Sequence, residues 1–264
     1  MKASTRTAIL LIAAAFAASC RAQTAVSPAA QAAALPAPAD SWSYNLLPAF
    51  VSQFMYRGQL LDGFSFQPTL TADYGNYEVG LWSNFPIQTP RQYAQTGPEN
   101  DVFGSYSYSI TDALSLKPGF LLYTYEFATP YRTTFEPSLA LSYTVGGITL
   151  TPTAYYDVVL RGPTYELSAS YAYPMPAFKT ELDLLATVGT YLLADSSPDT
   201  RAWGNYWLVG GTLPFKVTES QKFSVGYAYT EGTDAFTKQG SLAKVPNTDA
   251  VGRGVLTVSY SIDF

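Results

Sequence analysis

The sequence predicts an all-β fold, a single antiparallel up-and-down β-barrel of about twelve strands that spans a membrane. Three features support this: a strictly alternating last segment, repeated alternating segments of similar length, and loop lengths that sort with segment order. A tilted membrane strand needs about 9 to 11 residues, which matches the segments. A soluble β-sandwich is the alternative, but it gives no reason for the loops to sort in this way.

The N-terminus has the pattern of a secretory signal peptide over residues 1–22. Lys2 and Arg6 precede an apolar run over residues 8–18, which is about half of the roughly 20 residues that a spanning helix needs. Cleavage after Ala22 fits a small-x-small pattern. The stretch before Cys20 also loosely resembles a lipoprotein box, which would keep Cys20 as a lipidated N-terminus. Both routes stay open.

The next segment, residues 23–41, is rich in Ala and Pro and is expected to form a flexible lead. The barrel would then occupy residues 42–264. Hydrophobic residues make up 47% of the chain and charged residues 13%, too little charge for a disordered protein. The 21 tyrosines and 4 tryptophans suit membrane interfaces.

Twelve segments after Trp42 alternate between apolar and polar residues and are expected to form the wall. They are residues 46–56, 64–74, 77–85, 102–110, 114–125, 135–143, 148–160, 164–173, 180–193, 205–215, 222–230 and 255–264. Connections after even-numbered segments are short turns such as Gly75-Asn76, whereas the three longest loops follow odd-numbered segments. Outer-membrane barrels show this asymmetry, with short periplasmic turns and longer outer loops.

Four prolines lie inside these segments: Pro68, Pro118, Pro137 and Pro152. Each lacks the backbone donor that a sheet ladder uses, so we expect them near strand ends or at bulges.

The terminal segment places Phe264, Ile262, Tyr260, Val258 and Leu256 on one face and polar residues on the other. An aromatic last residue in such a strand resembles the segment by which bacterial outer-membrane barrels are recognised for assembly. The resemblance implies the outer membrane as the location, its lipids as surroundings, and the barrel-assembly machinery as a partner through Val255 to Phe264.

Several chemistries are excluded by composition. The chain contains no histidine, which removes Ser-His hydrolysis and His-ligated metal sites. We therefore expect no enzyme and no cofactor, although a site built from carboxylates or tyrosines stays possible. Glu181 and Asp183, two apart on one face, have the chemistry to bind a hard cation, but such residues more often line a wet surface.

Charge also limits the partners. Removing Lys2, Arg6 and Arg21 with the signal leaves 12 basic against 20 acidic residues, a net charge of −8. An acidic chain of this kind argues against nucleic acid as a partner.

If the apolar faces meet lipid, the charged residues of the segments point inward, because charge is costly on the lipid face. The residues predicted to line the lumen are Arg57, Asp73, Glu78, Lys117, Glu136, Asp157, Arg161, Glu166, Asp183 and Arg253. Asp101, Glu181, Lys222 and Asp263 share the same inward phase. Together these inward-facing residues are nine acids and five bases, and the resulting field inside the barrel would mildly favour cations.

A longer pattern covers about forty residues near the N-terminus. Ser52-x-Phe54-x-Tyr56-Arg57-Gly58, then Gln67-Pro68, then Gly80-Leu81-Trp82-Ser83-Asn84 resembles the first strands of a family of uncharacterised, porin-like bacterial outer-membrane β-barrels. The resemblance implies membrane insertion and passage of small solutes, and supplies no catalytic residues. Two functions follow: a passive channel for small hydrophilic solutes or ions, or a non-conducting barrel whose outer loops bind a ligand or partner.

Overall fold

The structure is a computed structural model, and it describes residues 41–88, 98–126, 133–193, 202–232 and 252–264. The predicted signal peptide and nearly all of the Ala/Pro-rich lead lie outside these ranges. The strands are β1 (Trp42–Leu47), β2 (Ala49–Val51), β3 (Phe54–Tyr56), β4 (Gln59–Asp62), β5 (Ser65–Phe66), β6 (Thr69–Tyr74), β7 (Tyr77–Pro86), β8 (Glu99–Tyr106), β9 (Tyr108–Ser109), β10 (Leu114–Tyr125), β11 (Thr133–Val145), β12 (Ile148–Asp157), β13 (Gly162–Met175), β14 (Thr180–Leu193), β15 (Ala202–Thr218), β16 (Gln221–Gly232) and β17 (Arg253–Asp263).

A short 3₁₀ helix, η1 (Pro176–Phe178), connects β13 to β14. Within the described ranges, no helix is long and apolar enough to span a membrane.

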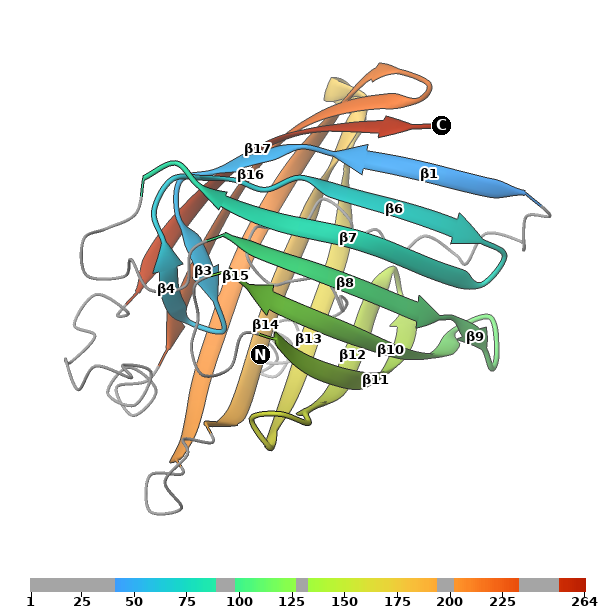
Figure 1. Ribbon diagram of the computed structural model, residues 1–264. Helices are drawn as coiled ribbons and strands as arrows, with labels where there is room; N and C mark the ends of the chain where they lie inside the picture. Colours follow the sequence, from blue (N-terminus) through green and yellow to red (C-terminus); the bar gives the residue numbers. More distant parts are fainter. Residues whose placement is uncertain (1–40, 89–97, 127–132, 194–201, 233–251) are drawn as a thin grey trace, which may run out of the picture.

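The sheet is a closed, antiparallel up-and-down barrel of twelve wall strands (Figure 1). Three wall strands are each interrupted once, so that β1 with β2, β5 with β6, and β8 with β9 each make one of the twelve. The barrel closes where β17 pairs with both β1 and β2, with Asn45 opposite Asp263 and Val51 opposite Thr257. The predicted fold is therefore confirmed, and the soluble sandwich is excluded.

The wall is apolar outside and polar inside, as strand β13 illustrates. Tyr165 and Leu167 are 51% and 42% exposed, whereas Glu166 and Ser168 are each 5% exposed. Strands β7, β12 and β16 repeat this alternation, and buried serines and threonines line much of the interior. This distribution is the reverse of a soluble protein, in which apolar side chains are buried. The alternation assigned from the sequence is thus confirmed.

The assignment of faces predicts opposite outcomes for two neighbouring substitutions. We expect Leu167→Arg to destabilise the membrane-inserted barrel by about 2–4 kcal/mol, the cost of a lipid-facing charge near the bilayer midplane. Ser168→Arg, one residue further along β13, faces the interior and is expected to be far better tolerated. Urea unfolding of both variants in lipid vesicles measures the difference. Equal losses of stability would contradict the assignment.

Turns and connections sort to the two ends of the barrel. One end, here called the short-turn end, carries Gly75-Asn76, Gly146-Gly147, η1 and Glu219-Ser220. The opposite end, here called the long-loop end, carries the connections after β7, β10, β12, β14 and β16.

The predicted seventh segment, residues 148–160, ends early in the structure. Strand β12 stops at Asp157, because the Asp157 Oδ1 atom accepts hydrogen bonds from the backbone N–H groups of Val159 and Leu160, at 2.9 and 2.7 Å.

The prolines only partly follow expectation. Pro68 lies in the interruption between β5 and β6, whereas Pro118, Pro137 and Pro152 lie inside continuous strands. At Pro118 and at Pro152, the strand keeps its pairing with one neighbouring strand, and the ladder with the other neighbour is interrupted opposite the proline. Pro118 keeps its pairing with Leu139 on β11, but the other ladder breaks opposite it, between β8 and β9. Opposite Pro152, the β11–β12 ladder has a gap, while the pairing with Leu167 on β13 continues.

Candidate functional site: a hairpin across the barrel interior

The first wall strand leaves the wall after Val51, and the chain folds into the barrel as a hairpin of β3 and β4. Within this inner hairpin, residues 52–64, strands β3 and β4 form a two-stranded sheet of their own that is not part of the wall ladder. Figure 1 shows it inside the barrel, at the end away from the C-terminus. The sequence prediction of a single wall strand over 46–56 is therefore wrong in its second half, because the adjacent apolar residues Phe54 and Met55 are both buried and break the alternation.

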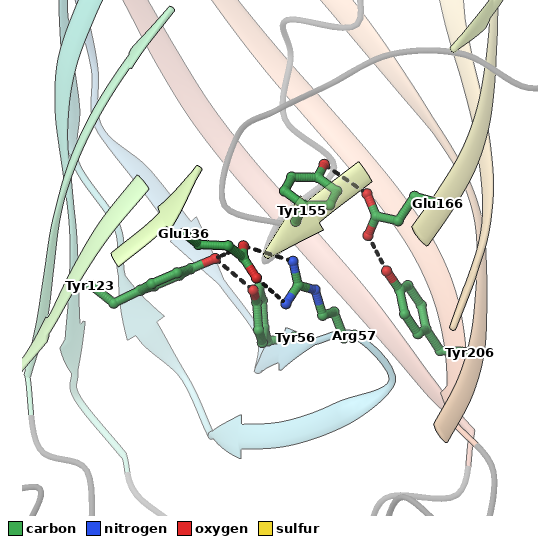
Figure 2. Close-up of polar contacts among 7 residues, drawn as sticks. All are labelled: Tyr56, Arg57, Tyr123, Glu136, Tyr155, Glu166 and Tyr206. Atoms are coloured by element: carbon green, nitrogen blue, oxygen red, sulfur yellow. Dashed lines mark hydrogen bonds and ion pairs between the residues drawn. The ribbon is translucent and has the colours of Figure 1, made fainter. Parts of the chain in front are cut away.

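The turn of the inner hairpin is Arg57-Gly58. Both residues have positive φ, 47° and 76°, which is the geometry of a tight two-residue hairpin turn. Gly58 also meets the wall closely, since a Cβ atom placed there would lie 2.6 Å from the Cα of Gly232 on β16. The predicted wall segment 46–56 ends directly before the Arg57-Gly58 pair, which forms a tip inside the barrel (Figure 2).

Two apolar clusters anchor the inner hairpin. Phe54 packs against Trp82 on β7 and Phe103 on β8, with the Phe54 and Trp82 ring centroids 5.6 Å apart. Met55 and Leu60, together with Val51 on β2, contact Val255 on β17. These clusters fix the hairpin to the part of the wall from which it arises.

Polar contacts extend the hairpin to the opposite wall, as Figure 2 shows. The two terminal nitrogens of Arg57 donate to the two carboxylate oxygens of Glu136 on β11, both at 2.9 Å. The Tyr123 hydroxyl donates to Glu136 Oε2 at 2.9 Å and lies 2.7 Å from the Tyr56 hydroxyl. Bidentate, charge-assisted bonds of this kind are among the strongest polar contacts in proteins.

A second carboxylate faces the first across the hairpin tip. Glu166 on β13 accepts hydrogen bonds from the hydroxyls of Tyr155, at 2.9 Å, and Tyr206. The Arg57 guanidinium lies over the ring of Tyr155, 5.1 Å from its centroid. The Gln59 amide donates to the Tyr191 hydroxyl on β14. The hairpin thus bridges the interior. It arises from the wall strands β2 and β5, and it reaches the group of wall strands from β11 to β15.

The base of the hairpin is joined to the wall by amides. The Gln67 amide donates to Asn84 Oδ1 at 2.9 Å, and the Asn84 amide donates to Asp62 Oδ2 at 3.3 Å. All three side chains are buried. Residues of the forty-residue pattern, among them Phe54, Tyr56 and Arg57, therefore lie together in space, around the inner hairpin.

The residues predicted to line the lumen are distributed as follows. Glu136, Asp157, Glu166 and Asp183 are buried on the inner face of the wall. Arg57 reaches the interior from the hairpin tip. Asp73, Glu78, Lys117 and Arg253 are partly buried, and Lys117 Nζ lies 3.6 Å from Glu78 Oε2. Arg161 is exposed with a positive φ of 55° in the turn 158–161, so it does not stand on the inner face of a strand.

The tyrosines of the site were not predicted: Tyr56, Tyr123, Tyr155, Tyr191 and Tyr206. The tyrosines were expected to suit membrane interfaces, and none was among the residues predicted to line the lumen. A usable signal existed for two of them, because Tyr155 is in phase with Thr153 and Asp157, and Tyr191 with Asp183 and Thr187. Both tyrosines are buried, so the position of a residue in the two-residue repeat, and not its type, decides which face of the wall it occupies.

A polar cavity of about 480 Å³ lies at the short-turn end of the barrel, away from the end where the inner hairpin lies. Its lining comes from β1, β6, β14, β15, β16 and β17, which is half of the wall. Four carboxylates and three lysines face it: Asp73, Glu181, Asp183, Asp263, Lys179, Lys216 and Lys222. Within the described part of the chain, no group of three or more potential ligand side chains is arranged to hold a metal ion.

Comparison with solved structures finds barrels of the same kind. The NanC porin aligns with 83% of this chain and 98% of its own, at 12% identity and a TM-score of 0.53. The KdgM porin covers 83% and 99%, at 12% identity and a TM-score of 0.52. An outer membrane channel from Pseudomonas putida F1 covers 88% and 97%, at 12% identity and a TM-score of 0.52. No protein-family model and no curated protein matches the chain. At this identity the likeness concerns the fold, which is the one that the forty-residue pattern implied.

Proposed function

We propose that this protein is an outer-membrane channel for ions and small hydrophilic solutes, with the inner hairpin as its constriction. The observation that carries the proposal is an interior lined by small polar and acidic side chains, which opens into a polar cavity at the short-turn end. A barrel that served only as an anchor would gain more by filling this space with packed side chains. The similar solved structures, two porins and a channel, support the same reading.

The solute path in this proposal runs past the Arg57–Glu136 contact. The hairpin tip brings one guanidinium near two carboxylates, Glu136 and Glu166, so the constriction carries net negative charge. The predicted lumen-lining residues, apart from the exposed Arg161, would extend this acidic excess along the path. We therefore expect a modest preference for cations, since rings of acidic side chains favour them.

Single-channel recording in a planar bilayer tests the proposal. We expect steady conductance steps in KCl, and a reversal potential under a salt gradient that indicates cation preference. The absence of steps from protein that is demonstrably folded, with heat-modifiable migration on a gel, would refute the channel. Steps with anion preference would leave the channel in place and refute the proposed role of the acidic excess.

The proposal extends to location and partners. The apolar exterior would contact outer-membrane lipids, and Val255 to Phe264, which close the barrel, would be read by the barrel-assembly machinery. We expect no catalytic activity, because the sequence has no histidine. The loop-binding alternative depends on segments such as 233–246, which lie outside the described residues, and no observation favours it.

A further inference from the structure

Two buried carboxyl groups on β8 have no role in the contacts described above. Glu99 and Asp101 stand two residues apart on the inner face of this strand and are 4% and 1% exposed. Among the described residues, no salt bridge reaches either of them, and neither oxygen of Asp101 accepts a hydrogen bond from a side chain. A carboxyl group enclosed without a cation is far more stable as the uncharged acid than as the carboxylate.

The inner hairpin packs on the residues that flank this pair. Asp101 has Trp82 on β7 and Tyr123 on β10 as its two register partners. Trp82 packs against Phe54 of the hairpin, with the ring centroids 5.6 Å apart, and the Tyr123 hydroxyl lies 2.7 Å from the Tyr56 hydroxyl. Asp101 therefore stands between the two wall residues that hold β3, and the docked hairpin shields it from water.

The hairpin also brings a further acid to the same place. Asn84 on β7 is the register partner of Glu99, and its amide donates to Asp62 Oδ2 on β4 at 3.3 Å. The described ionisable groups around the pair are all acids or phenols: Asp62 on β4, Tyr56 on β3, Tyr123 and Tyr125 on β10, and Glu136 on β11. The Arg57 guanidinium is bound by Glu136 through both of its terminal nitrogens. Ionisation of Glu99 and Asp101 would thus place negative charge beside negative charge.

We propose that Glu99 and Asp101 form a proton-sensitive switch for the inner hairpin, an inference that rests on the proposed role of the hairpin as the constriction. While the pair is uncharged, the hairpin stays docked over it. When the pair loses its protons, the charges favour a state in which water from the lumen reaches them, and the hairpin leaves its position. The docked state binds more protons than the undocked state, so docking is favoured at low pH and is lost as pH rises.

The composition of the chain makes such a response easy to detect. The chain contains no histidine. Between about pH 6 and about pH 9, exposed carboxylates stay charged and lysine and arginine stay protonated, so ordinary side chains contribute little change of charge. A change in hairpin docking over this range therefore reports acids in enclosed surroundings.

The test is hydrogen exchange of the amides of residues 54–62 in the folded barrel at about pH 6 and about pH 9, corrected for the intrinsic exchange rate at each pH. In the wild type, protection should fall about 10-fold or more between the two values. The double variant Glu99→Gln with Asp101→Asn carries neutral groups of the same shape, and its protection should change less than about 2-fold. Asp183→Asn removes a buried carboxyl group beside the short-turn cavity, away from the hairpin, and should keep the wild-type response.

Three outcomes would overturn the switch. They are wild-type protection that does not depend on pH, a double variant that responds to pH as the wild type does, and a folded double variant that has already lost protection at the lower pH. In the last case the carboxylates, and not the acids, would hold the hairpin. A response that disappears equally in Asp183→Asn would overturn it too, because it would belong to the whole interior.

Single-channel recording at the same two pH values separates this inference from the channel proposal. With both correct, conductance rises with pH in the wild type and stays constant in the double variant. Protection that falls in a barrel silent at both values would refute the channel and leave the switch in place. Steady conductance with protection that does not depend on pH would refute the switch alone.

Discussion

Replacement of the inner hairpin by a two-residue turn is expected to raise the single-channel conductance roughly threefold or more. Val51 and Ser65 are register partners at the base of the hairpin, so an Asn-Gly turn in place of residues 52–64 joins two strands that already pair. The change removes the Arg57 tip and the apolar residues that cross the interior. A twelve-stranded barrel freed of this hairpin is wider than an eight-stranded barrel, whose interior side chains alone fill.

A matched control is replacement of the turn 158–161 by Asn-Gly. This turn connects β12 to β13 at the same end of the barrel and carries the exposed Arg161, but it does not enter the interior. Its replacement is expected to leave the conductance unchanged. If both variants fold and conduct like the wild type, the hairpin does not limit passage, and the constriction lies elsewhere. If both raise the conductance equally, the effect belongs to the long-loop end in general.

The wall of the barrel is predictable from sequence because a membrane strand must satisfy two local conditions. It alternates with a period of two, and its lipid face excludes charge. Glu136, Asp157, Glu166 and Asp183 obey both conditions, and all four are buried on the inner face. Strand ends are less predictable, since they depend on single contacts such as the Asp157 side chain that bonds the following turn.

The inner hairpin is not predictable in the same way, because its signals are weak and its contacts are distant in sequence. Ser52 still pairs with β17 through hydrogen bonds to Leu256, so the alternation is intact up to the point of departure. Only the adjacent apolar pair Phe54-Met55 indicates burial on both sides. The partner of Arg57, Glu136, lies 79 residues away. The forty-residue pattern marked the correct segment, but not its place inside the barrel.

Loss of the ion pair at the hairpin tip is expected to weaken the docking of the inner hairpin. The side chains of Arg57 and Glu136 are 9% and 2% exposed, so removing one charge leaves the other enclosed without its partner. Breaking a buried ion pair in this way costs about 3–5 kcal/mol, whereas replacing both partners by apolar residues of similar size is often nearly neutral. We expect Glu136→Gln to loosen the hairpin, and Arg57→Met combined with Glu136→Leu to restore much of its docking.

Hydrogen exchange of the amides of residues 54–62 measures the docking, and the reversal potential in a salt gradient measures the charge of the constriction. Glu136→Gln should lower the protection of these amides and shift ion preference toward anions, since Arg57 then acts without that carboxylate. Glu219→Gln, on the exposed rim, should do neither. If the single and double variants lose protection equally, the apolar clusters around Phe54 and Val255 hold the hairpin, and the ion pair serves ion preference alone. If protection falls but ion preference stays unchanged in Glu136→Gln, the permeating ions do not pass the hairpin tip, and the path runs along another part of the wall.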